Sequence, residues 1–228
     1  MAEKNGMERN SEENIVINSP RMAVAEIAIR GIAPLVVARF SKKADMMAKM
    51  AEGGASKNKK DRKARDYEAE AREAKHISTD GWEGVCASAF RAASIDACRL
   101  VGFKMTMARM SIFIEGDGYD RDENTPLVRL YGDEAITYTA HVRNMTGVAD
   151  VRSRPMYKKW GCVLRVRYDQ DQFGAADVAN LIARAGIQVG ICEGRPMSKK
   201  SSGLGYGIFE IVPTDELKQF KKEYGIAA

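Results

Sequence analysis

The most constraining feature of this sequence is the order in which two hydrophobic periods follow one another between residues 22 and 212. Apolar side chains that alternate with period two are typical of half-buried strands, and spacings of three and four are typical of amphipathic helices. These patterns predict strands at 22–30, 103–116, 161–168 and 207–212, and helices at 80–101 and 174–185. The predicted order is therefore strand, helix, strand, strand, helix, strand.

This order predicts an α+β fold with a ferredoxin-like (RRM-like) βαββαβ core, in which both helices pack on one face of a four-stranded antiparallel sheet. The other face would be free, and RNA-recognition domains bind their ligand on that face. Arg109, Arg165 and Arg167 are expected to project from it on the two middle strands. The aromatic-rich motif of those domains is missing, because WGCVLRV (160–166) lacks its stacking pair.

The chain is expected to form one domain over residues 22–228, after a disordered or loosely attached tail at 1–21 rich in polar residues. Two insertions interrupt the core: a charged one at about 41–75, and one at about 116–158 that we expect to contain a hairpin of 127–132 with 135–143. The expected helix boundaries are Thr79 or Asp80 and Gly102 for the first helix, Gly186 for the second, and Thr214 for a C-terminal helix.

Composition limits the classes of function. The net charge of +5 permits an anionic partner such as nucleic acid without requiring one. No apolar segment reaches the roughly 20 residues of a membrane helix, and the N-terminus lacks the apolar core of a signal peptide. We therefore expect no membrane partner and a cytoplasmic location, in a bacterial cell or a phage-infected host.

Four separated cysteines and two histidines have no metal-ligand spacing, so we expect reduced thiols, no metal and no cofactor.

The segment SKKSSGLGYGIFEI (198–211) carries glycines at three alternate positions behind two lysines. A Walker loop is excluded because it places its lysine after the glycines, at the start of a helix. Two interpretations remain open. The glycines could let a phosphate approach backbone N–H groups, or they could pack the last strand against the second helix.

With this loop, three segments together resemble the RAMP superfamily, the backbone and processing proteins of CRISPR ribonucleoprotein complexes. SGLGYGIFEI (202–211) is similar to the glycine-rich loop and final strand of that superfamily. AEIAIRGIAPLVVARFS (25–41) is similar to its opening strand, and DGWEGVCASAFRAASIDACRL (80–100) to the turn that opens its first helix. The resemblance implies binding of single-stranded RNA or DNA, often by repeated subunits in a filament. The chain also resembles phage-encoded proteins, which implies a single-strand annealing, replication or recombination role.

The function expected first is non-enzymatic binding of single-stranded nucleic acid through backbone phosphates. The alternative is a RAMP-type RNA-processing endoribonuclease, for which His76 is the candidate general base; a structural phage assembly protein is a third class. Trp82, Tyr157 and Trp160 are considered as stacking platforms, each against a place in the core. The predicted phosphate-binding residues are Arg39, Lys42, Lys43, Lys57, Lys59, Lys60, Arg62, Lys63, Arg65, Arg109, Arg165, Arg167, Arg195, Lys199 and Lys200, with Gly203, Gly205, Tyr206 and Gly207 in the loop.

Overall fold

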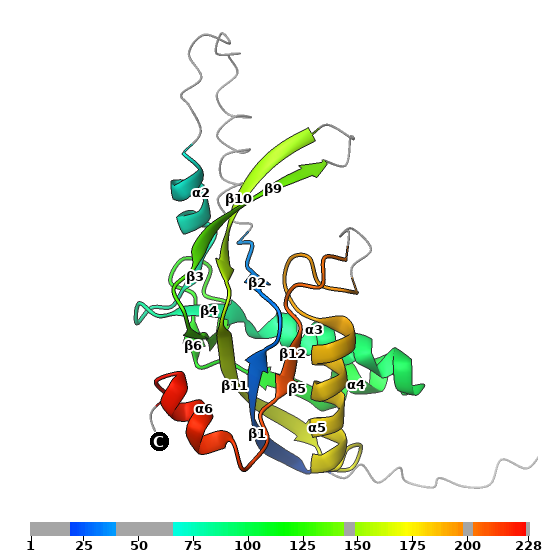
Figure 1. Ribbon diagram of the computed structural model, residues 1–228. Helices are drawn as coiled ribbons and strands as arrows, with labels where there is room; N and C mark the ends of the chain where they lie inside the picture. Colours follow the sequence, from blue (N-terminus) through cyan, green and yellow to red (C-terminus); the bar gives the residue numbers. More distant parts are fainter. Residues whose placement is uncertain (1–18, 40–65, 144–148, 198–202, 227–228) are drawn as a thin grey trace, which may run out of the picture.

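The computed structural model describes residues 19–39, 66–143, 149–197 and 203–226 (Figure 1). Its main sheet has the strand order β12 (Phe209–Ile211), β1 (Met22–Gly31), β11 (Trp160–Asp169) and β5 (Ile112–Glu115), and each neighbouring pair is antiparallel. The short strand β8 (Tyr131–Gly132) pairs with the start of β11. The predicted α+β class with an antiparallel sheet is confirmed, and so are the strands predicted at 22–30 and 161–168.

Two helices cover one face of this sheet (Figure 1). They are α3 (Ala87–Ala97) and α5 (Ala175–Arg184). Phe90 of α3 and Ile182 of α5 are buried with Ile29 and Leu164, which β1 and β11 present to the same face. The alternating residues of the two strands therefore point into a core that the helices close, because cross-strand partners share a face.

The helix boundaries differ from the prediction at three of four points. The first helix is preceded by a strand, β4 (Glu83–Cys86), and its N-cap is Cys86 rather than Thr79 or Asp80. After a 3₁₀ turn, η2 (Cys98–Val101), Gly102 ends it with φ +68, as predicted.

Gly186 does not end the second helix. The sequence IQVGI (187–191) predicts a short strand, but a π-helical segment, η3 (Ala185–Val189), continues the helix there and stops at Gly190, with φ +70. Gly186 is needed for close packing instead, because a Cβ there would lie 2.1 Å from the carbonyl oxygen of Phe209. The C-terminal helix α6 (Leu217–Glu223) starts after Glu216, later than the predicted cap Thr214.

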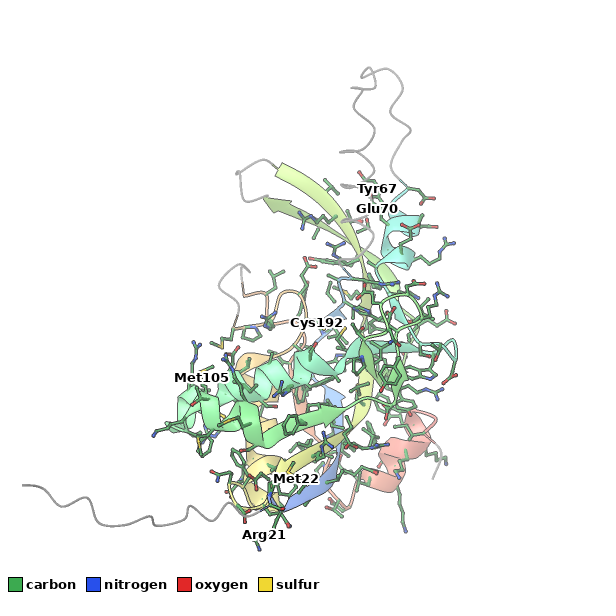
Figure 2. The ribbon with its side chains drawn as sticks, turned by 180° about the vertical axis from the view of Figure 1, so that it is seen from behind. Arg21, Met22, Tyr67, Glu70, Met105 and Cys192 are labelled. Atoms are coloured by element: carbon green, nitrogen blue, oxygen red, sulfur yellow. The ribbon has the colours of Figure 1, made fainter. Side chains whose placement is uncertain are left out.

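The predicted strand at 103–116 is only partly correct. Its first half forms a short helix, α4 (Met105–Ser111), whose first residue is labelled in Figure 2, and β5 begins at Ile112. Alternation in this segment predicts Met110 on the apolar face of a strand with Ala108, Ile112 and Ile114. In the structure Ala108 and Ser111 are buried at helical spacing, and Met110 is 68% exposed. Alternation over four or five residues also fits one turn of helix, so the pattern did not discriminate between them. Arg109 consequently lies on a helix, and its predicted position on the sheet face is wrong.

The predicted insertion at about 116–158 contributes strands to two further sheets. One has the order β2 (Leu35–Val36), β10 (Ala149–Tyr157), β9 (Ile136–Arg143), and the other β3 (His76–Ile77), β4, β7 (Pro126–Arg129), β6 (Gly118–Tyr119). The predicted pairing of 127–132 with 135–143 is wrong, because β9 pairs with β10, and β7 with β4 and β6. Strands β9 and β10 form an arm that leaves the main body beside α2 (Tyr67–Glu73) (Figure 1).

The second face of the main sheet is only half open. The helix α6 lies on it, opposite α5 (Figure 1), and buries Phe220 against Ala28 and Val212. Gly161 allows this approach, since a Cβ there would lie 2.9 Å from the Phe220 ring. The prediction of a free face therefore holds only for the end of the sheet that carries Arg165 and Arg167.

Candidate nucleic-acid interface

Many predicted phosphate contacts lie outside the described residues. They are Lys42, Lys43, Lys57, Lys59, Lys60, Arg62, Lys63, Arg65, Lys199 and Lys200. The predicted N-terminal tail also lies outside them, apart from residues 19–21. These residues stay predictions, and the structure bears on the remaining candidates.

Arg39 is not available to a phosphate. Its side chain is 4% exposed and forms ion pairs with Asp120 at 3.2 Å, Asp122 at 2.7 Å and Glu123 at 2.9 Å. These acids belong to the turn that follows β6, and the guanidinium occupies the centre of that turn. This arrangement argues against the prediction that Arg39 contacts nucleic acid, because a buried cation held by three carboxylates neither reaches nor attracts an external anion.

Arg165 and Arg167 do project from the open end of the sheet, about half exposed, but acidic side chains share this surface. Glu115 on the neighbouring strand lies 2.8 Å from Arg165 and 3.8 Å from Arg167. Glu26 of β1 is the cross-strand partner of Arg165. The guanidinium of Arg167 also stacks 5.3 Å from the Phe113 ring centroid. Two arginines and two glutamates leave little net charge here, so this surface is a weaker phosphate site than the sequence suggested.

The glycine loop has two distinct parts. At Gly207, with φ +67, a Cβ would lie 2.0 Å from the carbonyl oxygen of Ile191, so this glycine packs the chain against its neighbour. At Gly203 and Gly205, with φ +63 and +76, the nearest heavy atoms of the described residues to a Cβ would be 3.7 and 3.8 Å away. Close packing therefore accounts for Gly207, whereas Gly203 and Gly205 have a left-handed backbone without such crowding among the described residues, and the phosphate interpretation stays a prediction for them.

Hydrogen bonds fix the end of this loop between the start of β2 and the segment after η3. The Tyr206 amide donates to the Gly194 carbonyl at 3.1 Å, and the Gly207 amide donates to the Pro34 carbonyl at 2.8 Å. The amides of Tyr206 and Gly207 are therefore already used. The half-buried Arg195 donates to the Cys192 carbonyl at 3.0 Å, which directs its guanidinium back onto the same segment.

Tyr206 connects the loop to the arm. Its ring meets that of Tyr138 on β9 edge to face, with 5.9 Å between the centroids. The hydrogen bond to Tyr206, followed by burial, raises the pKa of the Tyr138 hydroxyl. Within the arm, Arg154 of β10 lies 3.0 Å from Glu193, in the segment after η3. The aromatic pair thus joins the β9–β10 arm to the glycine loop, and the ion pair joins it to the segment that precedes this loop.

The other aromatic candidates are part of the protein's own packing. Trp160 is fully buried and donates from its indole nitrogen to the Ala33 carbonyl at 2.8 Å. Tyr157 is buried, and its hydroxyl donates to Glu83 at 2.5 Å. Trp82 is half-buried, and the Arg129 guanidinium lies over it, 5.8 Å from the centroid of the Trp82 ring. Neither Trp160 nor Tyr157 can stack on a base.

His76 is buried, and both of its ring nitrogens have a partner. Nδ1 lies 3.0 Å from Oδ2 of Asp120, and Nε2 lies 3.5 Å from Sγ of Cys86. A base for an RNA 2′-hydroxyl needs a nitrogen that reaches the substrate. The arrangement of His76 therefore does not favour the endoribonuclease alternative.

Sequence reasoning missed Asp120 and Cys86 as partners of His76. Asp120 lies in an irregular stretch without a periodic pattern, and the helical spacing puts Cys86 on the apolar side of the first predicted helix. The signal that could have found Cys86 is the change from strand to helix at that residue, since the first amides of a helix have no partner within the helix.

Among the described residues, no group of three metal-ligating side chains could hold an ion, and the four cysteines are free thiols. Nor does any helix in the described ranges have the length and apolar character needed to span a bilayer. Neither a protein-family model nor a curated protein matches this chain.

Proposed function

We propose that this protein binds single-stranded nucleic acid through its backbone phosphates, without chemistry on the nucleic acid. The observation that carries the proposal is the uncrowded left-handed backbone at Gly203 and Gly205, beside the Tyr206–Tyr138 pair. Close packing accounts for Gly207 but not for Gly203 and Gly205, where a Cβ would contact the described residues only at ordinary van der Waals distance. A phosphate can approach a backbone that carries no side chain, and an adjacent aromatic pair offers an edge for a base.

The topology of the main sheet supports the same proposal. Its strand order β12-β1-β11-β5, with a helix after β1 and another after β11, is the order of a ferredoxin-like core. This order supports our proposal that the chain has a ferredoxin-like core, and the resemblance of its quoted segments leads us to propose a relationship to the RAMP superfamily. With that relationship, assembly as repeated subunits in a filament or ribonucleoprotein is part of the proposal.

In this proposal the affinity comes from the loop and the basic segments rather than from the sheet face. Lys199 and Lys200 directly precede the loop in sequence, and the segment 57–65 carries six of the predicted cationic contacts. Arg165 and Arg167 contribute less because Glu115 and Glu26 neutralise them.

The basic segment gives the first test. We expect weaker binding of a labelled single strand when the six basic residues of this segment are changed to Gln. The slope of log association constant against log salt concentration should become shallower by up to about 4, at about 0.7 per lost contact. The six residues are Lys57, Lys59, Lys60, Arg62, Lys63 and Arg65. Fluorescence anisotropy at several salt concentrations measures both quantities.

The matched control changes exposed lysines elsewhere. This control variant removes charge from α6, on the covered side of the sheet, by the changes Lys218→Gln, Lys221→Gln and Lys222→Gln. Its salt slope should differ from that of wild type by no more than the value of about one phosphate contact. The control removes three charges and the first variant six, so a loss in the control about half as large as in the first variant would mean that only total charge matters. Unchanged affinity in the first variant would remove the segment from the interface.

A further inference from the structure

Three side chains that can act in catalysis meet at one place in the sheet β3-β4-β7-β6. His76 lies on β3, Cys86 is the last residue of β4, and Asp120 directly follows β6. The register pairs His76 with Gly84, which brings the side chain of Cys86, two residues further along β4, onto the same face. Gly84 carries no side chain that could separate the imidazole from the thiol.

The distances place these groups in a linear order. Sγ of Cys86 is 3.5 Å from Nε2 of His76, and Nδ1 of the same ring is 3.0 Å from Oδ2 of Asp120. Nδ1–H donates to the carboxylate, so Nε2 can accept the thiol proton. A nucleophile, a base in reach of it and a carboxylate that orients the base form the arrangement that activates a catalytic thiol or hydroxyl.

The carboxylate is itself fixed. Oδ1 of Asp120 accepts hydrogen bonds from the amides of Asp122 at 2.9 Å and Glu123 at 3.0 Å, and from Arg39 at 3.2 Å. Burial opposes its charge, but the amides of Glu123 and Asp122, with His76 and Arg39, outweigh burial and lower the pKa of Asp120. The side chain is therefore an ion that holds one orientation of the imidazole.

The imidazole is set up to carry a proton. Burial lowers the pKa of His76, but the hydrogen bond and charge of Cys86, then those of Asp120, more than offset it, so the pKa is raised above the ordinary value. A base that becomes a stable imidazolium beside a sulfur atom assists thiol attack.

Cys86 also differs from the other cysteines in its surroundings. Cys98 and Cys162 are fully buried. Cys192 is partly exposed, as Cys86 is, but burial of its thiol raises the pKa of that thiol to about 12. Cys86 is partly exposed and is the N-cap of the eleven-residue helix α3, whose first amides its side chain does not cap. Amides at a helix N-terminus can stabilise an oxyanion next to an attacking sulfur.

We propose that Cys86 is a nucleophilic thiol that accepts acyl groups from activated esters or thioesters, with His76 as its general base and Asp120 as the positioning residue. Sγ attacks the acyl carbon while Nε2 takes the thiol proton, and the carbonyl electron pair moves to oxygen. The pair then reforms the carbonyl, the bond to the leaving group breaks, and that group takes the proton from Nε2. Water attacks the resulting thioester with Nε2 again as base, the carboxylic acid leaves, and the proton returns to sulfur.

p-Nitrophenyl acetate tests this proposal on the full chain. Wild type should release a burst of about one equivalent of p-nitrophenolate, and peptide mapping should find the acetyl group on Cys86. Cys86→Ser should abolish the burst, and His76→Gly should slow it at least ~100-fold, with partial recovery on addition of free imidazole. That recovery separates a proton-transfer role from a purely structural one.

The matched control is Cys192→Ser, which removes the neighbouring thiol and should leave the burst unchanged. Native-state alkylation of wild type by iodoacetamide needs no variant to fold, and it should label Cys86 before the other three cysteines. A wild-type protein without a burst, acetylation of Cys192 in place of Cys86, or alkylation that does not favour Cys86 would each overturn the proposal. Nucleic-acid binding is unaffected by either result, so the two proposals fail separately.

Discussion

Gly205→Asn should weaken binding of single-stranded nucleic acid at least about tenfold, equivalent to about 1.4 kcal/mol, while the melting temperature stays close to that of wild type. Asn tolerates the left-handed conformation better than other side chains, and the nearest heavy atom to a Cβ at this position is 3.8 Å away. The new side chain therefore occupies the path of the phosphate without crowding the protein. Anisotropy titration and thermal unfolding of the same preparation measure the two effects.

Gly225→Asn is the matched control. Gly225 has φ +65, and a Cβ there would meet no heavy atom of the described residues within 4 Å, but this glycine follows α6, away from the loop. Both variants carry the same conformational strain, so only the position differs. A Gly205→Asn protein that melts early yet binds normally while folded would show that the loop is structural and that the proposed function has the wrong site.

Arg39→Met should lower the free energy of unfolding by about 3 kcal/mol, because it leaves Asp120 buried without its cationic partner. Affinity for nucleic acid should change little as long as the variant is folded. Urea denaturation monitored by tryptophan fluorescence gives the stability, and anisotropy below the transition gives the affinity. An unchanged stability with a large loss of binding would return Arg39 to the interface.

The same network predicts how stability depends on pH. The pKa of Asp120 is lowered in the folded protein, so its contribution is present above the unfolded value, about 3.9, and is lost as the pH falls through the lower folded value. Arg39→Met should weaken this acid-dependent contribution together with the stability at neutral pH.

The central strands could be predicted from sequence because only one arrangement of each strand buries all of its alternating apolar side chains. In β1 and β11 the alternation continues over eight residues or more, and a one-residue shift would expose the entire apolar set. The helix α5 was equally clear, since Val178, Leu181 and Ile182 form one buried side.

Short elements could not be predicted, because packing decides them. The helix α4 has seven residues, and β4 has only four before α3 begins at Ala87. At such lengths the periods of helix and strand overlap. The pairing of β9 with β10 was missed for another reason: charged and polar residues interrupt the alternation in β10.

The candidate sites divide in the same way. The glycine loop is a local motif, so sequence identified it, although only the structure separates crowded Gly207 from open Gly205. The burial of Arg39 depends on a turn 81 residues further along the chain, and the contact of His76 with Asp120 spans 44 residues. No spacing rule connects residues that distant.

Salt-dependent binding to matched ligands tests the central claim most directly. Fluorescence anisotropy of the wild-type chain against labelled single-stranded RNA, single-stranded DNA and duplex of one sequence should show binding to single strands. The logarithm of their association constant should fall linearly with the logarithm of salt concentration, at about 0.7 per phosphate contact over several contacts. Binding to none of the three ligands, or an affinity for single strands that does not change with salt, would contradict the account.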